Sequence, residues 1–537
     1  MDKKAIWNSR PFLYITEFFA GMSVMAVELG ASRLLAPYFS SSQIVWTIII
    51  GTIMIAMALG NIYGGRKADK DPDPRRLYRR ILIAAIWIAA IPVLGKYVIL
   101  GISALLIFTV NSHFLIIAAF ASCIVVFVFP LFLLGTVTPS LAKYTTRSLD
   151  DNGRIIGSLG AFNTVGSIIG TFLPTFVTIP AVGTAVTFLL FSGILLVVAL
   201  IYFISTHTAG RRIVVGIVVF LVCCVLGHSG SFAFWETGLA YEGESVYNYL
   251  QVKETDRAVI LSTNVLFGVQ SIHIKDGSLT GMYYDYALAA PYMCAARERA
   301  AAGEETDVLI LGMGSGTYAT QLSRYFPELT VEGVEIDPKI TKLAYEYFEL
   351  PETTKVTTYD GRAYLAAVDE TYDVIMVDAY QDITIPFQMS TVEFFTMVRE
   401  HLAPGGVLVV NMNMRSEGPD QINAYLADTI AAVFPYVMTV DVPGTTNREL
   451  FASESADCCD TLLTGVWQEE DLQLQSLMLS VASNLRPYEA GNHVMTDDKA
   501  PVELLGMRQI DALIAGEVEQ YRALYEEDGI AGLLDSL

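Results

Sequence analysis

One stretch, Thr306 to Pro338, constrains the fold of this chain more than any other. Its pattern predicts a buried strand at 308–311, a glycine turn, a helix at 318–326 and a second strand at 331–336. A strand, a glycine turn and a helix that lead into a second strand make up the βαβ unit of nucleotide-binding folds. The sequence therefore predicts an α/β domain whose ligand lies at the carboxyl ends of the strands.

The spacing of the glycines indicates which nucleotide to expect. Gly312, Gly314 and Gly316 read G-x-G-x-G, and Glu335 stands near the end of the second strand. The dinucleotide fingerprint is G-x-G-x-x-G, and Thr317 occupies the place of its last glycine. An acidic side chain at the second strand tip can accept hydrogen bonds from both ribose hydroxyls. We therefore expect an S-adenosyl-type nucleoside rather than NAD; the alternatives are a nucleotide-like fold without a ligand and a chance glycine cluster.

Acidic side chains also follow the next two predicted strands. The strands at 355–359 and 372–377 are followed by Asp360 and Asp378. Because ligands bind at the carboxyl ends of such strands, these groups are expected beside the glycine turn. A carboxylate there can accept a proton from an attacking amine, so Asp378 is the candidate base and Asp382 a second candidate. The alternative role for both is to fix a loop or cap a strand.

The segments around this core complete the predicted domain. Upstream, short alternating strands within 247–276 predict a small antiparallel β lobe. A helix is expected at 282–290, stopped by Pro291. Downstream, strands near 436–442 and 448–452 are expected to form an antiparallel edge.

Charge divides the chain into two parts. Residues 1–231 contain 17 Lys and Arg against 8 Asp and Glu, whereas residues 232–537 contain 17 against 48. The strongly acidic second part would repel phosphates, so we predict no binding to nucleic acid and expect cationic partners instead. The six cysteines form no CxxC pattern and the six histidines are scattered, so we predict no metal site.

Long apolar runs dominate the first part and predict a multi-pass membrane domain. Most are near the ~20 residues that a spanning helix needs, and they lie at about 12–36, 43–64, 80–95, 97–112, 114–138, 155–178, 182–205 and 212–230. The third and fourth runs are short, so they form either a hairpin or one bent span, and the count is seven or eight. The predicted domains are a transmembrane domain at 1–230, a linker and β lobe at 231–290, and an S-adenosyl-binding Rossmann-like catalytic domain at 291–537.

The side of the membrane on which the catalytic domain lies depends on the number of spans. Basic residues in the N-terminal segment and in the loop 66–80 belong on the cytoplasmic side. Eight spans return the catalytic domain to the cytoplasm, and seven place it outside. We choose eight, because S-adenosyl nucleotides and reduced thiols belong to the cytoplasm.

The order of the motifs resembles the spermidine synthase family, and more closely its membrane-fused bacterial branch. The motifs are ESVYNYLQV, the glycine turn, VEIDP, YDGRAYL, YDVIMVDAY and TDDKAPVE, with VELGASRLLAPYF, PLFLLGTVTPSLAKY and GAFNTVGSIIGTF in the apolar part. The resemblance implies a class I methyltransferase-like sheet preceded by a small β lobe. It also implies transfer of an aminopropyl group from decarboxylated S-adenosylmethionine to a small amine such as putrescine, in polyamine biosynthesis at the bacterial inner membrane.

The resemblance assigns roles to individual residues. Glu335 corresponds to the ribose-binding acid, Asp360 to the adenine-contacting aspartate and Asp378 to the catalytic aspartate that deprotonates the amine. Tyr247 and Tyr284 correspond to tyrosines that line the amine site. The other candidates are Gly312, Gly314, Ser315, Gly316, Gly361 and Asn248 for the donor, and Asp285 and Asp382 for the substrate.

Three positions depart from the family pattern. Soluble members read Gly-Gly-Gly-Asp-Gly-Gly at the turn, where the aspartate helps to hold the aminopropyl ammonium; Ser315 stands there in this chain. The family's glutamine after the first tyrosine is Asn248. Its Tyr-His-Glu is Tyr284-Asp285-Tyr286, so an acid is lost or shifted to Asp285. Candidates for replacement acids, or for a structural ion pair, are Asp497, Asp498 and Glu503.

Two other functions remain as alternatives. One is a methyltransferase that uses intact S-adenosylmethionine, which Ser315 favours because the donor's carboxylate would meet no aspartate. The other is a polyamine transporter with a nucleoside-sensing soluble domain, supported by Glu28 and Arg33 in the first span, which are otherwise a structural ion pair. The expected partners are a small cationic amine and the lipid bilayer, and the resemblance also allows a homodimer.

Overall fold

The computed structural model divides the chain into two compact units, which we describe separately. The first comprises Met1–Glu236, Gly243–Tyr249 and Glu517–Leu537, and the second Thr237–Glu242 and Leu250–Gly516. The residues that the structure describes are 9–39, 42–107, 110, 113–146, 152–208, 210–228, 231–236, 238–265, 268–379, 385–413, 415, 416, 418, 420–513, 515 and 516.

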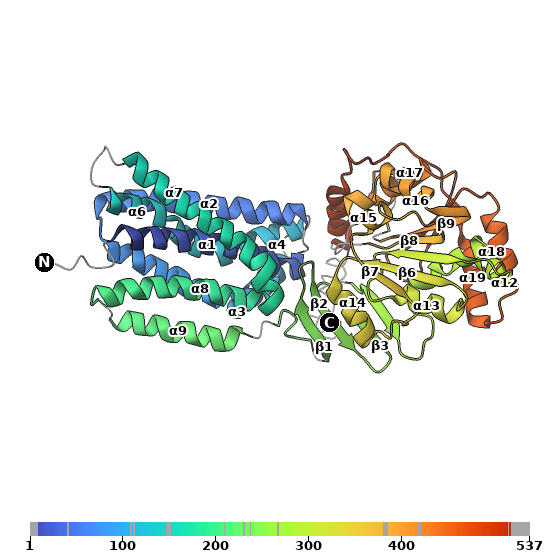
Figure 1. The fold of residues 1–537 in the computed structure, drawn as a ribbon, viewed down its shortest axis with the longest axis horizontal. Helices are drawn as coiled ribbons and strands as arrows, with labels where there is room; N and C mark the ends of the chain where they lie inside the picture. Colours follow the sequence, from blue (N-terminus) through green and yellow to red (C-terminus); the bar gives the residue numbers. More distant parts are fainter. Residues whose placement is uncertain are drawn as a thin grey trace. The chain divides into compact units, whose positions relative to one another are not determined.

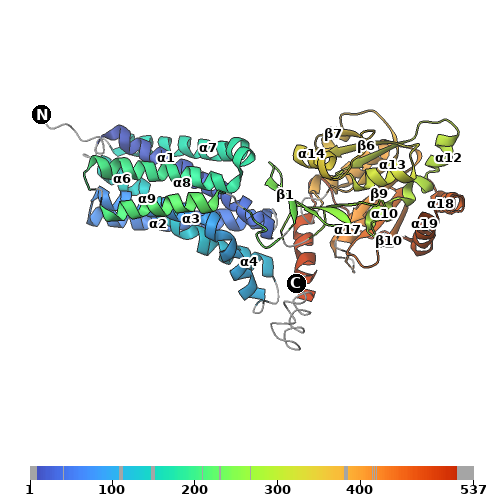
Figure 2. The same cartoon turned by 90° about the horizontal axis from the view of Figure 1, so that it is seen from below.

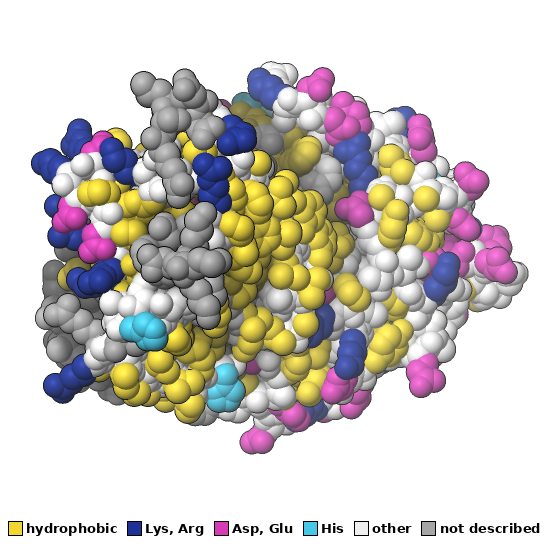
Figure 3. Space-filling model, turned by 60° about the vertical axis from the view of Figure 1, so that its left-hand side comes forward, with side chains coloured by type: hydrophobic (Ala, Val, Ile, Leu, Met, Phe, Trp, Pro, Cys, Tyr) yellow, Lys and Arg dark blue, Asp and Glu magenta, His cyan; other side chains and the backbone are white. Residues whose placement is uncertain are grey.

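The first unit is a bundle of apolar helices (Figure 1). Five helical runs in it are long and apolar enough to cross a membrane. Large hydrophobic side chains such as Met54, Leu105 and Val225 are exposed, and Figure 3 shows many of this kind on the surface. The helices are α1 (Arg10–Phe39), α2 (Gln43–Lys70), α3 (Pro74–Ile107), α4 (Phe114–Cys123), α5 (Phe129–Gly135), α6 (Val137–Thr145), α7 (Asn152–Leu173), α8 (Ile179–Ser205) and α9 (Arg211–Gly227).

The runs differ from the predicted spans at two places. The two short runs between 80 and 112 lie largely within one continuous helix, α3, so they form no hairpin. The run Asn152–Ser205 has 54 residues, about 80 Å of helix, which is more than twice a hydrocarbon core of about 30 Å. It holds two predicted spans, and Gly183 interrupts it with a φ of 80°. With the shorter helix Ile213–Gly227, the described helices divide into seven apolar segments. The choice of eight spans has no support among them.

Two glycines of α7, Gly166 and Gly170, let α1 and α7 pack closely. A Cβ atom on Gly166 would lie 2.0 Å from the carbonyl oxygen of Phe18, and one on Gly170 would lie 2.0 Å from that of Met22. Only hydrogen fits at these two positions, so a larger side chain at either would separate the helices.

Two charged side chains of α1 form hydrogen bonds within the first unit. Glu17, which was not predicted from the sequence, is 0% exposed and accepts hydrogen bonds from Thr138 (2.5 Å) and Asn163 (2.8 Å). Arg33 donates to the backbone carbonyl of Val246. The roles predicted for Glu28 and Arg33, in transport or in an ion pair, stay predictions.

A carboxylate caps the part of α8 that follows Gly183. The backbone amide of Thr184 donates to Glu244 Oε2 (2.7 Å), and its hydroxyl donates to Oε1 (2.6 Å). The backbone N–H groups in the first turn of a helix have no acceptor within the helix. We therefore expect Glu244→Ala to lower the free energy of unfolding by about 1–2 kcal/mol, measured by thermal unfolding in detergent. The control Glu254→Ala removes an exposed ion pair with Lys275 and should change it by less than about 0.5 kcal/mol. Equal losses in the two variants would contradict the capping role.

The predicted β lobe is a four-stranded sheet in the order β1-β2-β3-β4. Strands β2, β3 and β4 pair antiparallel, as expected. The helix expected after it is divided into two short helices, and Pro291 lies inside the second. Pro291 is the third residue of that helix, in the first turn, where no intrahelical bond needs its missing N–H. The elements are β1 (Leu239–Glu244), β2 (Tyr249–Glu254), β3 (Ala258–Ser262), β4 (Ser271–Ile274), α10 (Tyr283–Ala287) and α11 (Ala289–Met293).

The second unit is built on an eight-stranded mixed sheet, which confirms the predicted methyltransferase-like fold. The strand order is β12-β10-β11-β9-β8-β5-β6-β7. Strands β5 to β9 are parallel, and β11 and β10 form the antiparallel edge that the sequence predicts. The strands are β5 (Asp307–Leu311), β6 (Thr330–Glu335), β7 (Lys355–Thr358), β8 (Tyr372–Val377), β9 (Leu402–Met412), β10 (Tyr436–Asp441), β11 (Arg448–Ser453) and β12 (Arg486–Pro487).

Helices cover both faces of this sheet (Figure 1, Figure 2). Helices α10, α11, α13 (Thr317–Tyr325), α18 (Cys458–Val466) and α19 (Leu472–Asn484) share one apolar core with the sheet. Helices α15 (Gly361–Leu365), α16 (Val392–Glu400) and α17 (Ile422–Ala431) share the other. Side chains along a strand point alternately to the two faces, so Val409 belongs to the first core and Val410 to the second. Helix α14 (Pro338–Tyr347) packs against β2 and β3.

Candidate active site

The glycine turn between β5 and α13 has the close backbone approach that its sequence predicts. Gly312, Gly314 and Gly316 have φ values of 84°, 59° and 85°, a region that favours glycine. A Cβ atom on Gly312 would lie 2.5 Å from the Cα atom of Ala379, the residue after Asp378. The turn and the tip of β8 are therefore in direct backbone contact.

Glu335 lies beside this turn at the end of β6. Its Oε2 accepts a hydrogen bond from the Gly314 amide (2.8 Å) and its Oε1 one from the Asp337 amide (3.0 Å). Burial raises the pKa of Glu335 to about 7. Each carboxylate oxygen can accept more than one hydrogen bond, so the hydroxyls of a ribose can still donate to it.

Asp378 follows β8 at the same edge of the sheet and is partly exposed. Its Oδ2 accepts a hydrogen bond from the Tyr283 hydroxyl (2.6 Å) and its Oδ1 one from the Asn411 amide (2.9 Å). Burial raises the pKa of Asp378 to about 7, although these two hydrogen bonds lower it. A carboxylate with a pKa near neutrality can take up and release a proton at physiological pH.

Neither of the residues that hold Asp378, Tyr283 and Asn411, was predicted from the sequence. Tyr283 lies at the start of α10, next to the predicted Tyr284, and their ring centroids are 3.9 Å apart. Asn411 is a buried polar residue near the end of β9, and its own oxygen accepts a hydrogen bond from Asn447 (2.9 Å). The signal for Asn411 was present, because a polar residue near the end of the apolar run VLVVNM stands at a strand tip.

Tyr284 and Asp285 have other partners in the described structure. The Tyr284 hydroxyl donates to the backbone carbonyl of Gln270 (2.8 Å). Asp285 is 1% exposed and accepts from the amide and hydroxyl of Thr280, the Gly281 amide and the Gln321 side chain. These contacts fix the loop before α10, and the substrate-binding roles predicted for both residues stay predictions.

Asp360 and its neighbours cap and anchor α15. The Asp360 carboxylate accepts from the Ala363 amide (2.8 Å), and Gly361 opens the helix. Arg362 donates to both carboxylate oxygens of Asp497 (2.7 and 2.6 Å), which favours the structural ion pair over a replacement acid. Contact of Asp360 and Gly361 with the donor stays a prediction.

The remaining predicted residues fall into three places. Tyr247 and Asn248 lie in the turn between β1 and β2, where both amides donate to Ser245 Oγ. This turn belongs to the first unit, so the roles predicted for it are untested. Asp382 lies outside the described residues.

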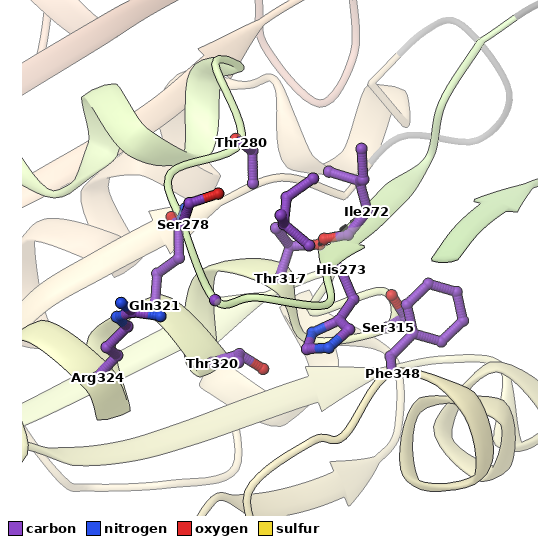
Figure 4. A pocket seen from close by; sticks show the side chains of 12 residues that line it. Ile272, His273, Ser278, Thr280, Ser315, Thr317, Thr320, Gln321, Arg324 and Phe348 are labelled. Carbon is purple, nitrogen blue, oxygen red and sulfur yellow. Dashed lines mark hydrogen bonds between the residues drawn. The ribbon is translucent and has the colours of Figure 1, made fainter. Parts of the chain in front are cut away.

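Ser315 lines a pocket between β4 and α13 that does not include Asp378 or Glu335 (Figure 4). Ser315 is 1% exposed, and its hydroxyl has no hydrogen-bond partner among the described residues. Its neighbours in the pocket include Thr317 and Gln321. An unpaired buried hydroxyl in the glycine turn is suited to a polar group of a ligand.

The hydrogen bond from Tyr283 should lower the pKa of Asp378, and a matched pair of variants can test this. Burial, and then the charge of Asp378, raise the pKa of Tyr283 well above its usual range, so this hydroxyl stays a donor. In Tyr283→Phe the Asp378 carboxylate loses that hydrogen bond. The acid limb of the pH–rate profile should rise by about one pH unit, and turnover at pH 7 should fall about fivefold. Tyr284→Phe should leave the profile in place; equal shifts would contradict the assignment.

The described residues contain no group of three or more His, Cys, Asp or Glu side chains arranged to hold a metal ion.

The sequence is similar to those of several known proteins. The family model described as the spermine/spermidine synthase domain matches residues 293–451. A protein named probable polyamine aminopropyl transferase, from Bifidobacterium longum, is 54% identical over 355 residues, which cover 62% of this chain and 77% of that protein. A polyamine aminopropyltransferase from Vibrio vulnificus is 27% identical over 324 residues, which cover 58% of this chain and 96% of that one.

A solved structure of a probable spermidine synthase from Corynebacterium glutamicum is also similar, with a TM-score of 0.36 and 21% identity over 48% of this chain and 97% of that one. A likeness at that score does not identify the family. The Bifidobacterium protein, 54% identical and matched over 77% of its length, does identify it. Together with the family model over β5 to β11 and the carboxylates at their tips, it shows that this chain belongs to the spermine/spermidine synthase family of polyamine aminopropyltransferases.

Proposed function

We propose that this protein is a membrane-bound aminopropyltransferase that moves the aminopropyl group of decarboxylated S-adenosylmethionine to a small amine such as putrescine. The observation that carries the proposal is the contact between the glycine turn and the backbone next to the base, Asp378. Gly312 meets the backbone of Ala379, so Asp378 lies next to the backbone that would bind the nucleoside.

The reaction needs few groups. The nitrogen of a neutral amine attacks the aminopropyl carbon bonded to the sulfonium, a C–N bond forms, and the C–S bond breaks with its electrons on sulfur. Methylthioadenosine leaves as a neutral thioether. Asp378 accepts the proton that the nitrogen loses and passes it to solvent. Alignment of the amine, the carbon and the sulfur supplies much of the rate enhancement.

The residues at the turn fit such a donor. Glu335 offers carboxylate oxygens to the ribose hydroxyls, and the glycine turn leaves no side chain in the way. The hydroxyl of Ser315, buried and unpaired, stands where soluble relatives carry an aspartate. A serine there binds the donor's ammonium less strongly than an aspartate would, which also favours the second candidate, a methyltransferase that uses intact S-adenosylmethionine.

Calorimetry on the purified full chain in detergent tests the donor. Decarboxylated S-adenosylmethionine, intact S-adenosylmethionine and methylthioadenosine would be compared, followed by product analysis with 1,4-diaminobutane. Tighter binding of the decarboxylated donor and formation of an aminopropyl product support the proposal. Tighter binding of intact S-adenosylmethionine with transfer of a methyl group would establish the second candidate instead.

The membrane part of the proposal rests on the apolar helices of the first unit. We place the catalytic unit in the cytoplasm, because that is where S-adenosyl nucleotides are made. Seven crossings and a cytoplasmic N-terminal segment would instead place it outside. A tag fused after Leu537 decides between the two: reaction with an impermeant reagent only in opened cells supports the cytoplasm, and reaction in intact cells contradicts it.

A further inference from the structure

A second buried carboxyl group, that of Glu449, lies next to the site and takes part in none of its hydrogen bonds. Glu449 is 0% exposed, and neither of its oxygens has a hydrogen-bond partner. Buried polar groups are almost always paired, and an unpaired carboxyl group destabilises the folded state. A residue of this kind near a catalytic carboxylate suggests a ligand that the structure does not contain.

The strand registers place Glu449 on the same sheet face as Asp378. Glu449 on β11 pairs directly with Asn411 on β9, so the two side chains share a face. On the parallel side, Val410 pairs with Val377, which puts Asn411 beside Asp378. Neighbouring strands are about 4.8 Å apart, so the backbones of Asp378 and Glu449 are about 10 Å apart.

The donors around Glu449 are already used. The Asn411 amide binds Asp378, and the Asn447 amide binds the Asn411 oxygen. Burial, and then the neighbouring Cys294 and Glu449, raise the pKa of Tyr318 well above its usual range. Its hydroxyl donates to the backbone carbonyl of Ala287 (3.0 Å).

Positive charge is also missing at this position. Among the residues that the structure describes, neither Asp378 nor Glu449 has an ion-pair partner. The neighbouring Arg448 and Arg415 both form ion pairs with Asp441. Burial, and then the charge of Asp378, raise the pKa of Glu449 well above its usual range. The pair of carboxyl groups therefore favours a ligand that brings positive charge and N–H donors at two points.

We propose that Glu449 binds the ammonium group at the far end of the acceptor while Asp378 receives the amine that reacts. This inference rests on the proposed function and specifies its acceptor as a short diamine. An ammonium group supplies three N–H donors and a positive charge, which are what the Glu449 carboxyl group lacks. A monoamine of the same length would leave Glu449 unpaired. Glu449 is then a specificity-determining residue and Asp378 the base.

The test compares two acceptors with decarboxylated S-adenosylmethionine as the donor: 1,4-diaminobutane and 1-aminobutane. In the full-length protein we expect kcat/KM to favour the diamine by a factor on the order of 100, the usual effect of losing one partner of a buried charge pair. In Glu449→Gln the diamine should lose most of this advantage, chiefly through a higher KM. The ratio between the two acceptors should fall below about 5.

A matched variant controls for loss of structure. Glu332 is also a buried glutamate of the sheet, but its carboxylate is paired with Lys355 (2.9 Å) and Tyr364 (2.6 Å). Glu332→Gln should keep the diamine preference of the natural protein. Calorimetric binding of methylthioadenosine should be unchanged in both variants, which shows that the nucleoside site is still folded.

The outcomes separate this inference from the proposed function. If the natural protein transfers the aminopropyl group but uses both acceptors equally well, or if Glu449→Gln slows both acceptors by the same factor, the role of Glu449 is wrong while the function holds. If the natural protein forms no aminopropyl product from either acceptor, the proposed function itself is wrong.

Discussion

Replacing Asp378 by asparagine is expected to lower turnover about 1,000-fold while leaving donor binding in place. Asparagine is nearly the same size and can keep hydrogen bonds to Tyr283 and Asn411, but it cannot accept the amine proton. The measurement is the rate of product formation from decarboxylated S-adenosylmethionine and 1,4-diaminobutane. Methylthioadenosine should bind within about threefold of the natural affinity, since a loss of that binding would mean that the turn, and not the chemistry, was damaged.

The pH dependence of the natural protein provides an independent check on this role. Because burial raises the pKa of Asp378 to about 7, the base is lost to protonation as the pH falls below that value. We expect kcat/KM to fall tenfold per pH unit on the acid side. A rate that stays level down to pH 5 would identify a different proton acceptor.

The same substitution should change stability in the opposite direction to activity. The pKa of Asp378 is raised in the folded protein from 3.8 to about 7, so the folded state binds this proton more tightly than the unfolded state. The charged form therefore destabilises the fold increasingly as the pH rises from about 4 to about 7, and fully above that. The melting temperature of Asp378→Asn minus that of the natural protein should therefore be larger at pH 8 than at pH 4. A lower melting temperature at pH 8 would show that the carboxylate is required for folding.

Much of the second unit could be predicted because its signals are local. The strand at 372–377 has the same bounds in the structure, and the strand at 308–311 begins one residue earlier, at Asp307. Continuous apolar runs between turns mark buried parallel strands, and the carboxyl ends of those strands coincide with Glu335 and Asp378. The positions of these two carboxylates follow from pattern alone.

The partners of Asp378 could not be predicted in the same way. Adjacent residues of a helix point about 100° apart, so the choice between Tyr283 and Tyr284 depends on the residue at which α10 begins. The position of Glu449 beside Asn411 depends on the register of β11 against β9. Helix α17 and strand β10 separate these two strands in the chain. Helix α3 continues across the gap between the third and fourth predicted runs, because Gly95 weakens a helix without breaking it.

The largest structural effect is expected from Gly312→Ala. Gly312 has a φ of 84°, and its added methyl group would lie 2.5 Å from the Ala379 Cα atom and 2.7 Å from the Asp378 carbonyl oxygen. These are backbone atoms at the tip of β8, which carries the base. The glycine turn therefore cannot make room for the methyl group without moving that tip. We expect the free energy of unfolding to fall by about 3 kcal/mol, from backbone strain and overpacking together. Turnover should fall about 100-fold because Asp378 is displaced from the donor turn.

Gly405→Ala separates the two causes, because Gly405 has nearly the same φ, 81°, with no atom within 4 Å of the added methyl group. Strain alone should lower its free energy of unfolding by about 1 kcal/mol and leave turnover unchanged. Chemical unfolding and steady-state rates on the two variants therefore measure what close packing at the turn adds. If Gly312→Ala loses no more stability than Gly405→Ala and keeps its rate, the glycine turn does not set the position of Asp378 relative to the donor site.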